Sequence, residues 1–214
     1  MVKSQKNVSD DRSTEAQILD AARRVFVRRG VAAARTQEIA DEAGVNKALL
    51  HYYYRSKENL ADAVFLEAAR HLFPPMVATF VSGLPLREKL LRAIQLQTDA
   101  ATANPFLPGF VMCELRTDAA RLTRLLHAVL PVETAQQQLV AALQADLDAE
   151  AAAGRLRPTQ AETFLVAFLS LAVFPFAGSH MLNTLLGLDA AALDRLAAWR
   201  RAELADTLLR AFAP

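Results

Sequence analysis

Residues 36–55, TQEIADEAGVNKALLHYYYR, decide the fold, because they contain two short amphipathic segments on either side of a glycine. Thr36 is predicted to cap the first segment, whose inward face includes Ile39. Gly44 follows at the point where a chain that ends one helix needs a left-handed residue without a Cβ penalty. Asn46 is the expected N-cap of the second segment. The stretch therefore predicts a helix-turn-helix.

The second helix of such a unit enters the major groove of DNA, so its two faces have different tasks. Leu50 and Tyr53 fall on its inner face and are interpreted as packing residues. Asn46, Lys47 and Ala48 open the helix, where side chains reach base edges first. Asparagine suits adenine and lysine suits guanine, which makes these positions candidates for base readout.

Other polar side chains of the same stretch are candidates for backbone contacts. Thr36 and Gln37 begin the first helix, whose N-terminal amides and partial positive charge attract a phosphate. Tyr52 faces outward and offers either its hydroxyl to a phosphate or its ring to a thymine methyl group. His51 is a further possible phosphate donor. Together with the base readers, these side chains form the expected DNA-binding surface.

Composition and charge agree with this interpretation. The 214 residues carry a net charge of +1, but residues 1–60 hold 11 Lys and Arg against 8 Asp and Glu. The basic excess therefore lies with the helix-turn-helix. No apolar run reaches the length of a membrane span, and no charged segment followed by an apolar run opens the chain. With a single cysteine, Cys113, these features predict a cytoplasmic protein without a membrane partner.

Helical periodicity extends over nearly the whole chain, and no strand pattern appears, which predicts an all-α fold of about nine helices. Residues 1–13 are polar without periodicity and are expected to form a mobile N-terminal arm. A capping box of Thr14 and Gln17 begins a helix that ends at Gly30. It completes a three-helix head over residues 14–55.

The rest of the chain, residues 56–214, is expected to form a helical ligand-binding and dimerisation domain. A helix that starts at Ser56 and runs to Pro74 follows the head without a flexible linker, which predicts a rigid connection. Near the C-terminus, the helix that contains Phe164 and Phe168 has almost no polar face. Together with the final helix, residues 189–212, it suggests a four-helix interface with a symmetry mate, and an ordinary monomeric core is the alternative.

The head, read as T-x-E-I-A-x-x-A-G-V-x-x-x-x-L-x-x-Y-Y-x-S-K-E-x-L, resembles the TetR family of bacterial transcription regulators. The resemblance covers roughly residues 14–60. It implies a homodimer that binds a palindromic operator in double-stranded DNA, usually as a repressor, and that is released when a small molecule binds the C-terminal domain. It also implies that Lys57 contacts a phosphate. The family usually has tyrosine where His51 stands and phenylalanine where Tyr54 stands, so Tyr54 is expected in the core with its hydroxyl at the edge.

The expected effector is small and hydrophobic or aromatic, because the C-terminal domain is rich in phenylalanine. Pro175 is expected to break its helix and leave room for such a ligand. Plain core packing is the alternative for these apolar positions, and a buried small hydrophobe is the simplest interpretation of Cys113. The candidate ligand-binding residues are Phe106, Phe110, Met112, Cys113, Phe168 and Phe174.

Other classes of function find less support in the sequence. The four histidines show no spacing with one another or with acidic residues that is typical of a metal site. No nucleophile elbow, phosphate-binding glycine loop or spaced carboxylate pair indicates an enzyme, so no cofactor, metal ion or catalytic residue is expected. The alternative to a regulator is a helical protein of another class, an enzyme or a protein-interaction module, that uses an apolar cavity.

Overall fold

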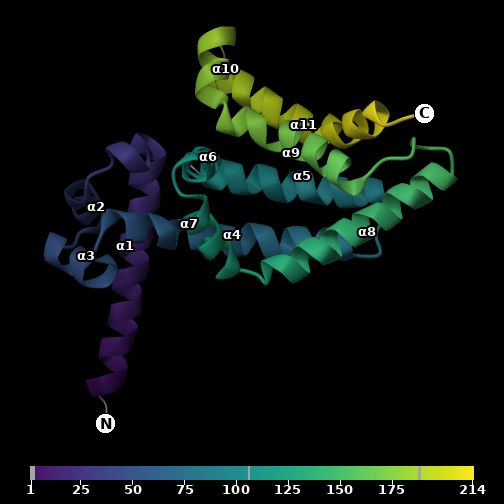
Figure 1. The fold of residues 1–214 in the computed structure, drawn as a ribbon. Coiled ribbons are helices and arrows are strands. Elements are labelled where there is room, and N and C mark those ends of the chain that lie inside the picture. The colour runs from purple at the N-terminus through teal and green to yellow at the C-terminus, as the bar shows by residue number, and fades with distance from the viewer. Residues whose placement is uncertain (1–2, 106, 188) are drawn as a thin grey trace. The chain divides into compact units, whose positions relative to one another are not determined.

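The computed structural model describes residues 3–105, 107–187 and 189–214, with side chains from residue 14 onward except those of residues 113–117, 180, 190 and 193. Over these residues the chain forms eleven helices and no strand (Figure 1), which confirms the all-α class. The expected number of about nine was too low. The additional helices are short, and α10 (Ser179–Leu186) begins directly after Gly178 without a capping side chain.

The chain folds as two compact units, Met1–Ala68 and Ala69–Pro214. The first unit contains α1 (Lys3–Ala33), α2 (Thr36–Ala43), α3 (Lys47–Tyr54) and the start of α4 (Lys57–Val81). The second contains the rest of α4 and seven further helices: α5 (Leu86–Ala103), α6 (Leu107–Thr117), α7 (Ala119–His127), α8 (Val132–Ala152), α9 (Ala161–Ala177), α10 and α11 (Ala190–Ala211). The boundary lies inside α4 rather than before it, because Leu60, Ala61 and Val64 at the start of α4 are buried.

Two predicted helix boundaries differ from the structure. The chain is helical from Lys3, where the sequence predicts an arm without regular structure over residues 1–13, although the backbone breaks at Gly30 (φ 70°, ψ 160°) as expected. Helix α4 continues through Pro74 and Pro75 to Val81. A proline removes its own N–H and crowds the carbonyl four residues earlier, but the turns on either side of it still form.

The first unit packs α1 against α2 and α2 against α3. Its core consists of apolar side chains at helical spacing on α1 together with two or more buried residues from each of α2, α3 and the start of α4. Those that are completely or almost completely buried include Ile18, Val25, Phe26, Ile39, Leu50 and Leu60.

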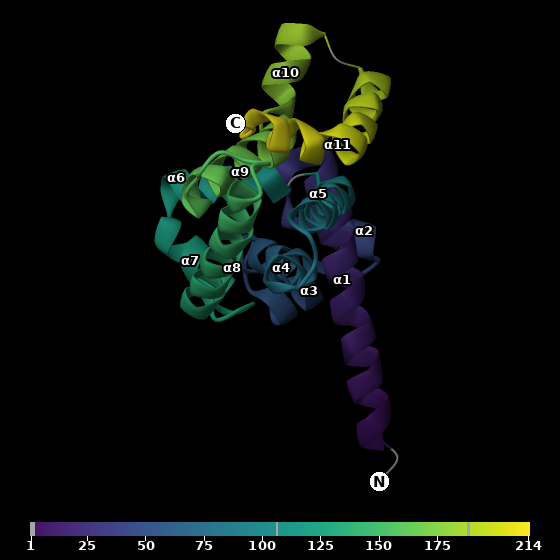
Figure 2. The same cartoon turned by 90° about the vertical axis from the view of Figure 1, so that its right-hand side faces the viewer.

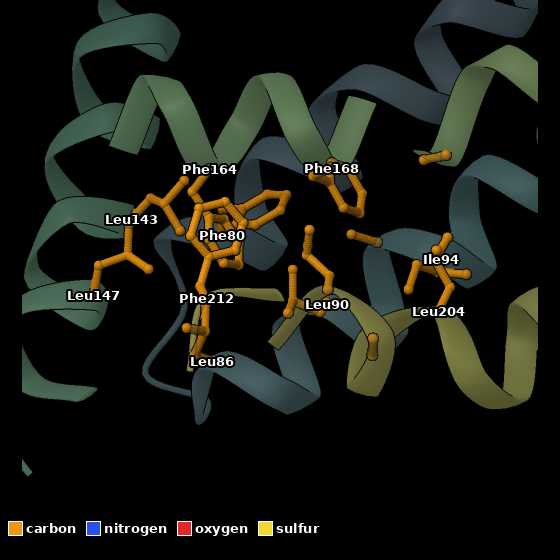
Figure 3. Packing of buried hydrophobic residues seen from close by; sticks show 14 of the residues in the cluster. Phe80, Leu86, Leu90, Ile94, Leu143, Leu147, Phe164, Phe168, Leu204 and Phe212 are labelled. Atoms are coloured by element: carbon orange, nitrogen blue, oxygen red, sulfur yellow. The ribbon is translucent and has the colours of Figure 1, made fainter. Parts of the chain in front are cut away.

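The second unit is organised around α5, which packs against α8, α9 and α11. Figure 2 views α4 and α5 nearly end-on, with α9 and α11 across one side of α5. Figure 3 shows the core between these helices, where Phe80, Phe164 and Phe212 gather with Leu90 and Leu143. The Phe164 and Phe212 ring centres lie 5.0 Å apart, and those of Phe80 and Phe168 lie 5.9 Å apart in an edge-to-face arrangement.

Two ion pairs join α5 to its neighbours. Lys89, which is 2 % exposed, places its Nζ 2.6 Å from Oδ2 of Asp146 on α8. Arg87 donates two hydrogen bonds, 2.7 and 2.8 Å long, to the carboxylate of Asp206 on α11. These bonds hold the pKa of the Asp206 carboxyl below its usual range. The buried lysine is the more consequential of the two cations, because removing its partner would strand a charge away from water.

A third cation, Arg200 on α11, is 1 % exposed and forms no ion pair with the described carboxylates. Its Nη1 donates to the carbonyl oxygen of Leu171 at 2.8 Å, and its Nη2 donates to the carbonyl of Ala172 and to Oε1 of Gln97. Pro175 explains the first contact. Because proline has no N–H, the Leu171 carbonyl has no donor four residues later in α9. The guanidinium supplies that missing donor.

The same contact corrects the expectation that Pro175 leaves room for a ligand. Helix α9 continues past Pro175 to Ala177, and the Arg200 side chain hydrogen-bonds at the affected turn, with its guanidinium 4.7 Å from the centre of the Phe176 ring. Burial lowers the pKa of Arg200 to about 10, so the group remains a cation at neutral pH. A buried cation thus satisfies carbonyls where the helix ladder is interrupted.

This pairing predicts thermodynamic coupling between Arg200 and Pro175. Arg200→Met should destabilise the protein by about 1–3 kcal/mol, because buried carbonyls lose their donor. In a Pro175→Ala background the loss should be smaller, since alanine at that position would return an N–H to the Leu171 carbonyl. Urea unfolding of the four proteins of the double-mutant cycle measures the coupling, which we expect at about 0.5–3 kcal/mol. Strict additivity would show that the two residues act independently.

Candidate nucleic-acid interface

The turn between α2 and α3 has the geometry that the sequence predicts. Gly44 is left-handed (φ 67°, ψ 27°), and its N–H donates to the Asp41 carbonyl at 3.2 Å. The N–H of Val45 reaches back to the Ala40 carbonyl at 3.0 Å. This pair of bonds closes the end of α2 and fixes the direction in which the chain enters α3.

Asn46 caps α3, as expected: its Oδ1 accepts the N–H of Leu49 at 2.7 Å. The cap occupies one of the two groups that a bidentate contact with adenine needs, so the side-chain amide remains as a donor to DNA. At the start of α2, Arg35 rather than Thr36 occupies the N-cap position, and Thr36 is the first helical residue. Thr36 was thus misplaced by one position as a cap, while it still lies at the N-terminus of α2.

The two faces of α3 are sharply different. Leu50 and Tyr54 are buried, and Tyr54 donates its hydroxyl to the Glu15 carbonyl at 3.3 Å, which confirms the expected core position with the hydroxyl at the edge. Burial raises the pKa of the Tyr54 phenol above its ordinary value. The opposite face carries no acidic residue, and four of the predicted contact residues are exposed on it: Lys47, Ala48, His51 and Tyr52. Tyr52 is 73 % exposed.

Two other predicted contact residues have partners within the protein. Lys57 directs its Nζ to the carbonyl oxygens of Ala32 and Ala34, at 2.9 and 3.2 Å, and so holds the junction between α1 and α2. An ammonium group has three N–H donors, so one remains for a phosphate. Gln37, which is exposed at the start of α2, donates to Oδ1 of Asp41 at 2.8 Å.

Arginines of α1 neutralise two carboxylates of α2. Glu42 accepts hydrogen bonds from Arg24 at 2.7 Å and from Arg28 at 2.6 Å, and both bonds hold the pKa of the Glu42 carboxyl below its usual range. Arg29 similarly donates to Glu38 at 3.3 Å. Two of the three carboxylates of α2, those of Glu38 and Glu42, are therefore neutralised by arginines, whereas Asp41 accepts a hydrogen bond from the uncharged Gln37 amide.

Sequence reasoning missed two exposed arginines that flank the helix-turn-helix. Arg35 precedes α2 and Arg55 follows α3, and the described residues give neither guanidinium a hydrogen-bond or ion-pair partner. Their position was the available signal, because a basic residue directly outside either helix lies beside the expected DNA backbone. Arg29, by contrast, forms an ion pair with Glu38.

The candidate ligand residues are distributed differently. Phe168 lies in the core of the second unit, and Phe110 is buried with the Arg121 guanidinium 5.9 Å from its ring centre. Met112 and Phe174 are 44 % and 50 % exposed. Phe106 lies outside the described residues, as does the side chain of Cys113. Two surface grooves, one along α8 and the start of α9 and one between α1 and α2, are lined by none of these residues.

Among the described side chains, no group of three or more His, Cys, Asp or Glu residues is placed to hold a metal ion. The described helices also include none with both the length and the apolar content needed to cross a bilayer.

Known proteins match the chain in both sequence and fold. A family profile described as bacterial regulatory proteins, tetR family, matches residues 18–64. The regulator BetI of Brucella suis biovar 1 is 30 % identical over 145 residues, which cover 64 % of this chain and 72 % of BetI. TtgR of Pseudomonas putida is 31 % identical over 153 residues, with coverages of 65 % and 73 %. The match to the repressor KstR2 of Rhodococcus jostii, at 30 % identity, spans only 43 % of that protein.

Solved structures extend the likeness to almost the whole chain. The hemolysin II regulator HlyIIR has a TM-score of 0.62 at 22 % identity, covering 95 % of this chain and 99 % of its own. PfmR of Thermus thermophilus has a TM-score of 0.63 at 19 % identity, with coverages of 90 % and 97 %. At these identities the likeness concerns the fold alone.

A glycine turn that fixes two short helices, with an acid-free outer face on the second, defines a helix-turn-helix regulator of transcription. The match to BetI and TtgR over more than two thirds of their length makes the class specific. The chain belongs to the TetR family of bacterial DNA-binding transcription regulators.

Asn46 caps α3 and is also a predicted DNA contact, so substitutions at this position can separate the two roles. Asn46→Asp should keep the cap and the stability of the head, because aspartate caps as well as asparagine. The added carboxylate should nevertheless weaken DNA binding by repelling phosphates. Asn46→Ala should instead cost about 1 kcal/mol of stability. Thermal unfolding together with DNA titration measures both effects. Asn46→Ser is the uncharged control, because serine retains a cap without adding a carboxylate. Unchanged DNA affinity of Asn46→Asp would remove this position from the interface.

Proposed function

We propose that the protein is a ligand-responsive repressor that binds a palindromic operator as a homodimer and is released by a small hydrophobic effector. The observation that carries the DNA-binding part is the outer face of α3, where Lys47, Ala48, His51 and Tyr52 are exposed beside one another without an acidic residue. A helix docked in the major groove reads bases from its N-terminal side chains. Asn46 and Lys47 are therefore the proposed readers.

Backbone contacts complete the proposed interface. Thr36 and Gln37 lie at the N-terminus of α2, whose free amides suit a phosphate. Lys57 retains one donor beyond its two carbonyl partners, and His51 and Tyr52 supply further donors from α3. These contacts would orient the head on the duplex without reading its sequence.

The direct test is a gel shift against the DNA that flanks the gene itself, measured over a range of salt concentrations. The expected result is a specific complex whose affinity falls steeply with salt, since phosphate contacts release counterions. This experiment also decides against the rival function, a helical enzyme or protein-interaction module with an apolar cavity. Absence of any specific, salt-sensitive complex would refute the proposed function.

Lys47 is the residue on which sequence preference should depend. Lys47→Ala should reduce discrimination at one base pair of each half-site by about 1–3 kcal/mol, because the variant loses a contact to a guanine edge. Binding of operator variants with single substitutions in each half-site measures the effect. An unchanged order of preference among those variants would place Lys47 on the backbone or outside the interface.

The proposed dimer uses α9 and α11. Helix α9 buries Phe164 and Phe168 against its own unit, whereas Val166 and Leu169 on its other side remain 64 % and 46 % exposed. Trp199 on α11 is 45 % exposed. Apolar side chains at helical spacing on adjacent helices support a helical interface with a second copy.

Val166→Glu should therefore convert the dimer into a monomer, because each interface would bury an unpaired carboxylate. Sedimentation velocity at micromolar concentration measures the change. Val27→Glu on α1 is the matched control, since Val27 is also exposed (43 %) and lies in the first unit. Equal sedimentation of Val166→Glu and the parent protein would place the interface elsewhere.

For the effector we propose a small hydrophobic or aromatic molecule bound in the second unit near Phe110, Met112, Phe168 and Phe174, with Phe106 and Cys113 on the same segments. The aromatic character of α9 supports this class of ligand. The ligand would favour a conformation in which the two heads no longer match half-sites about one helical turn apart.

A further inference from the structure

The junction between α3 and α4 contains an unusual backbone conformation. Arg55 has φ 60° and ψ −41°, and among the described residues no other non-glycine residue has a positive φ. The N–H of Ser56 donates to the Tyr54 carbonyl at 2.6 Å, which closes a three-residue γ-turn around Arg55. A γ-turn with a positive φ at its centre is rare and strained for an L-residue.

The neighbouring structure holds this turn in place. The N–H of Arg55 itself donates to the His51 carbonyl at 2.9 Å, at the end of α3. On the other side, Oγ of Ser56 accepts the N–H of Asn59 at 3.1 Å and so caps α4. Tyr54 before the turn and Leu60 after it are both buried. Two anchored helices therefore impose the conformation on whichever residue stands at position 55.

Glycine tolerates a positive φ without a Cβ penalty, and the other positive-φ positions described in this unit, Gly30 and Gly44, are glycines. The chain instead places an arginine there. Strained backbone is characteristic of sites where ligands are held, so the arginine side chain is the feature that requires an explanation.

That side chain is exposed and has no partner among the described residues, whereas Arg24, Arg28 and Arg29 in the same unit all pair with carboxylates. Arg55 directly follows Tyr54, the last residue of α3, whose exposed face carries Lys47. We propose that Arg55 binds a DNA phosphate at the C-terminal end of α3 and that the γ-turn directs its guanidinium toward the backbone of the duplex.

This inference rests on the proposed DNA-binding function and adds a contact to it. A guanidinium suits the role because its planar fork donates two parallel hydrogen bonds to phosphate oxygens. The contact would be independent of sequence, and it would add to the proposed phosphate contacts at the N-terminus of α2. The head would then hold the DNA backbone at the end of the reading helix as well as at the start of α2.

The test uses the full chain and three substitutions, with the flanking DNA and a random duplex of about 30 base pairs as probes. Arg55→Gly should raise the Tm by a few degrees, because glycine relieves the strain at φ 60°. The same variant should bind both duplexes about five- to tenfold more weakly at about 0.15 M salt, and the slope of log affinity against log salt should shrink by about 0.9. Arg55→Lys should keep the slope of the parent protein.

Arg92→Ala is the control for net charge, since Arg92 is exposed on α5 in the second unit. This substitution should leave the slope of log affinity against log salt unchanged for both duplexes. Higher Tm with an unchanged slope for Arg55→Gly would overturn the phosphate contact, and a lower Tm would overturn the strain argument. The random duplex distinguishes the two proposals. If the parent protein does not bind the flanking DNA specifically, the proposed repressor function is refuted, while the salt dependence of binding to random DNA still tests the Arg55 contact.

Discussion

The left-handed turn at Gly44 is the constraint on which the candidate interface depends. Its backbone bonds, together with the Asn46 cap, fix where α2 ends and α3 begins, and thereby decide which side chains of α3 face inward. A side chain at position 44 would meet no neighbour, so the requirement for glycine is conformational rather than steric. Once Leu50 and Tyr54 are buried, the period of the helix sends Lys47, His51 and Tyr52 outward. The exposed surface proposed for readout is thus a consequence of packing.

In both units a basic side chain donates hydrogen bonds to backbone carbonyl oxygens at a point where a helix is interrupted. In the first unit, Lys57 binds the carbonyls of Ala32 and Ala34, just after the break at Gly30. In the second, Arg200 binds the carbonyl that Pro175 leaves without a donor. A carbonyl without a donor is costly where it is shielded from water, and a long basic side chain reaches these carbonyls from another helix. Both residues therefore stabilise the fold through polar contacts that a list of ion pairs would miss.

Local features of the sequence predicted most of the head correctly. The turn at Gly44, the cap at Asn46 and the break at Gly30 depend on a few neighbouring residues, so their patterns are visible in the chain itself. The partners of Lys57 and Arg200 are distant along the chain, and no local pattern predicts them. The same limit applies to the extension of α4 through Pro74 and Pro75, and to the strained turn at Arg55, where the flanking helices impose a conformation that arginine does not prefer.

At the two ends of α3, stability and the proposed DNA contacts place different demands on single residues. At its start, Asn46 uses its oxygen for the cap, so only its amide is left for the proposed contact with a base. At its end, stability is sacrificed for the proposed contact, because Arg55 stands at a positive-φ position where glycine would be more stable. A helix of eight residues is too short to be stable alone, so its caps and its packing on α2 must hold it. Strain at the exposed end is tolerable only because Tyr54 and Leu60 anchor the chain on both sides of it.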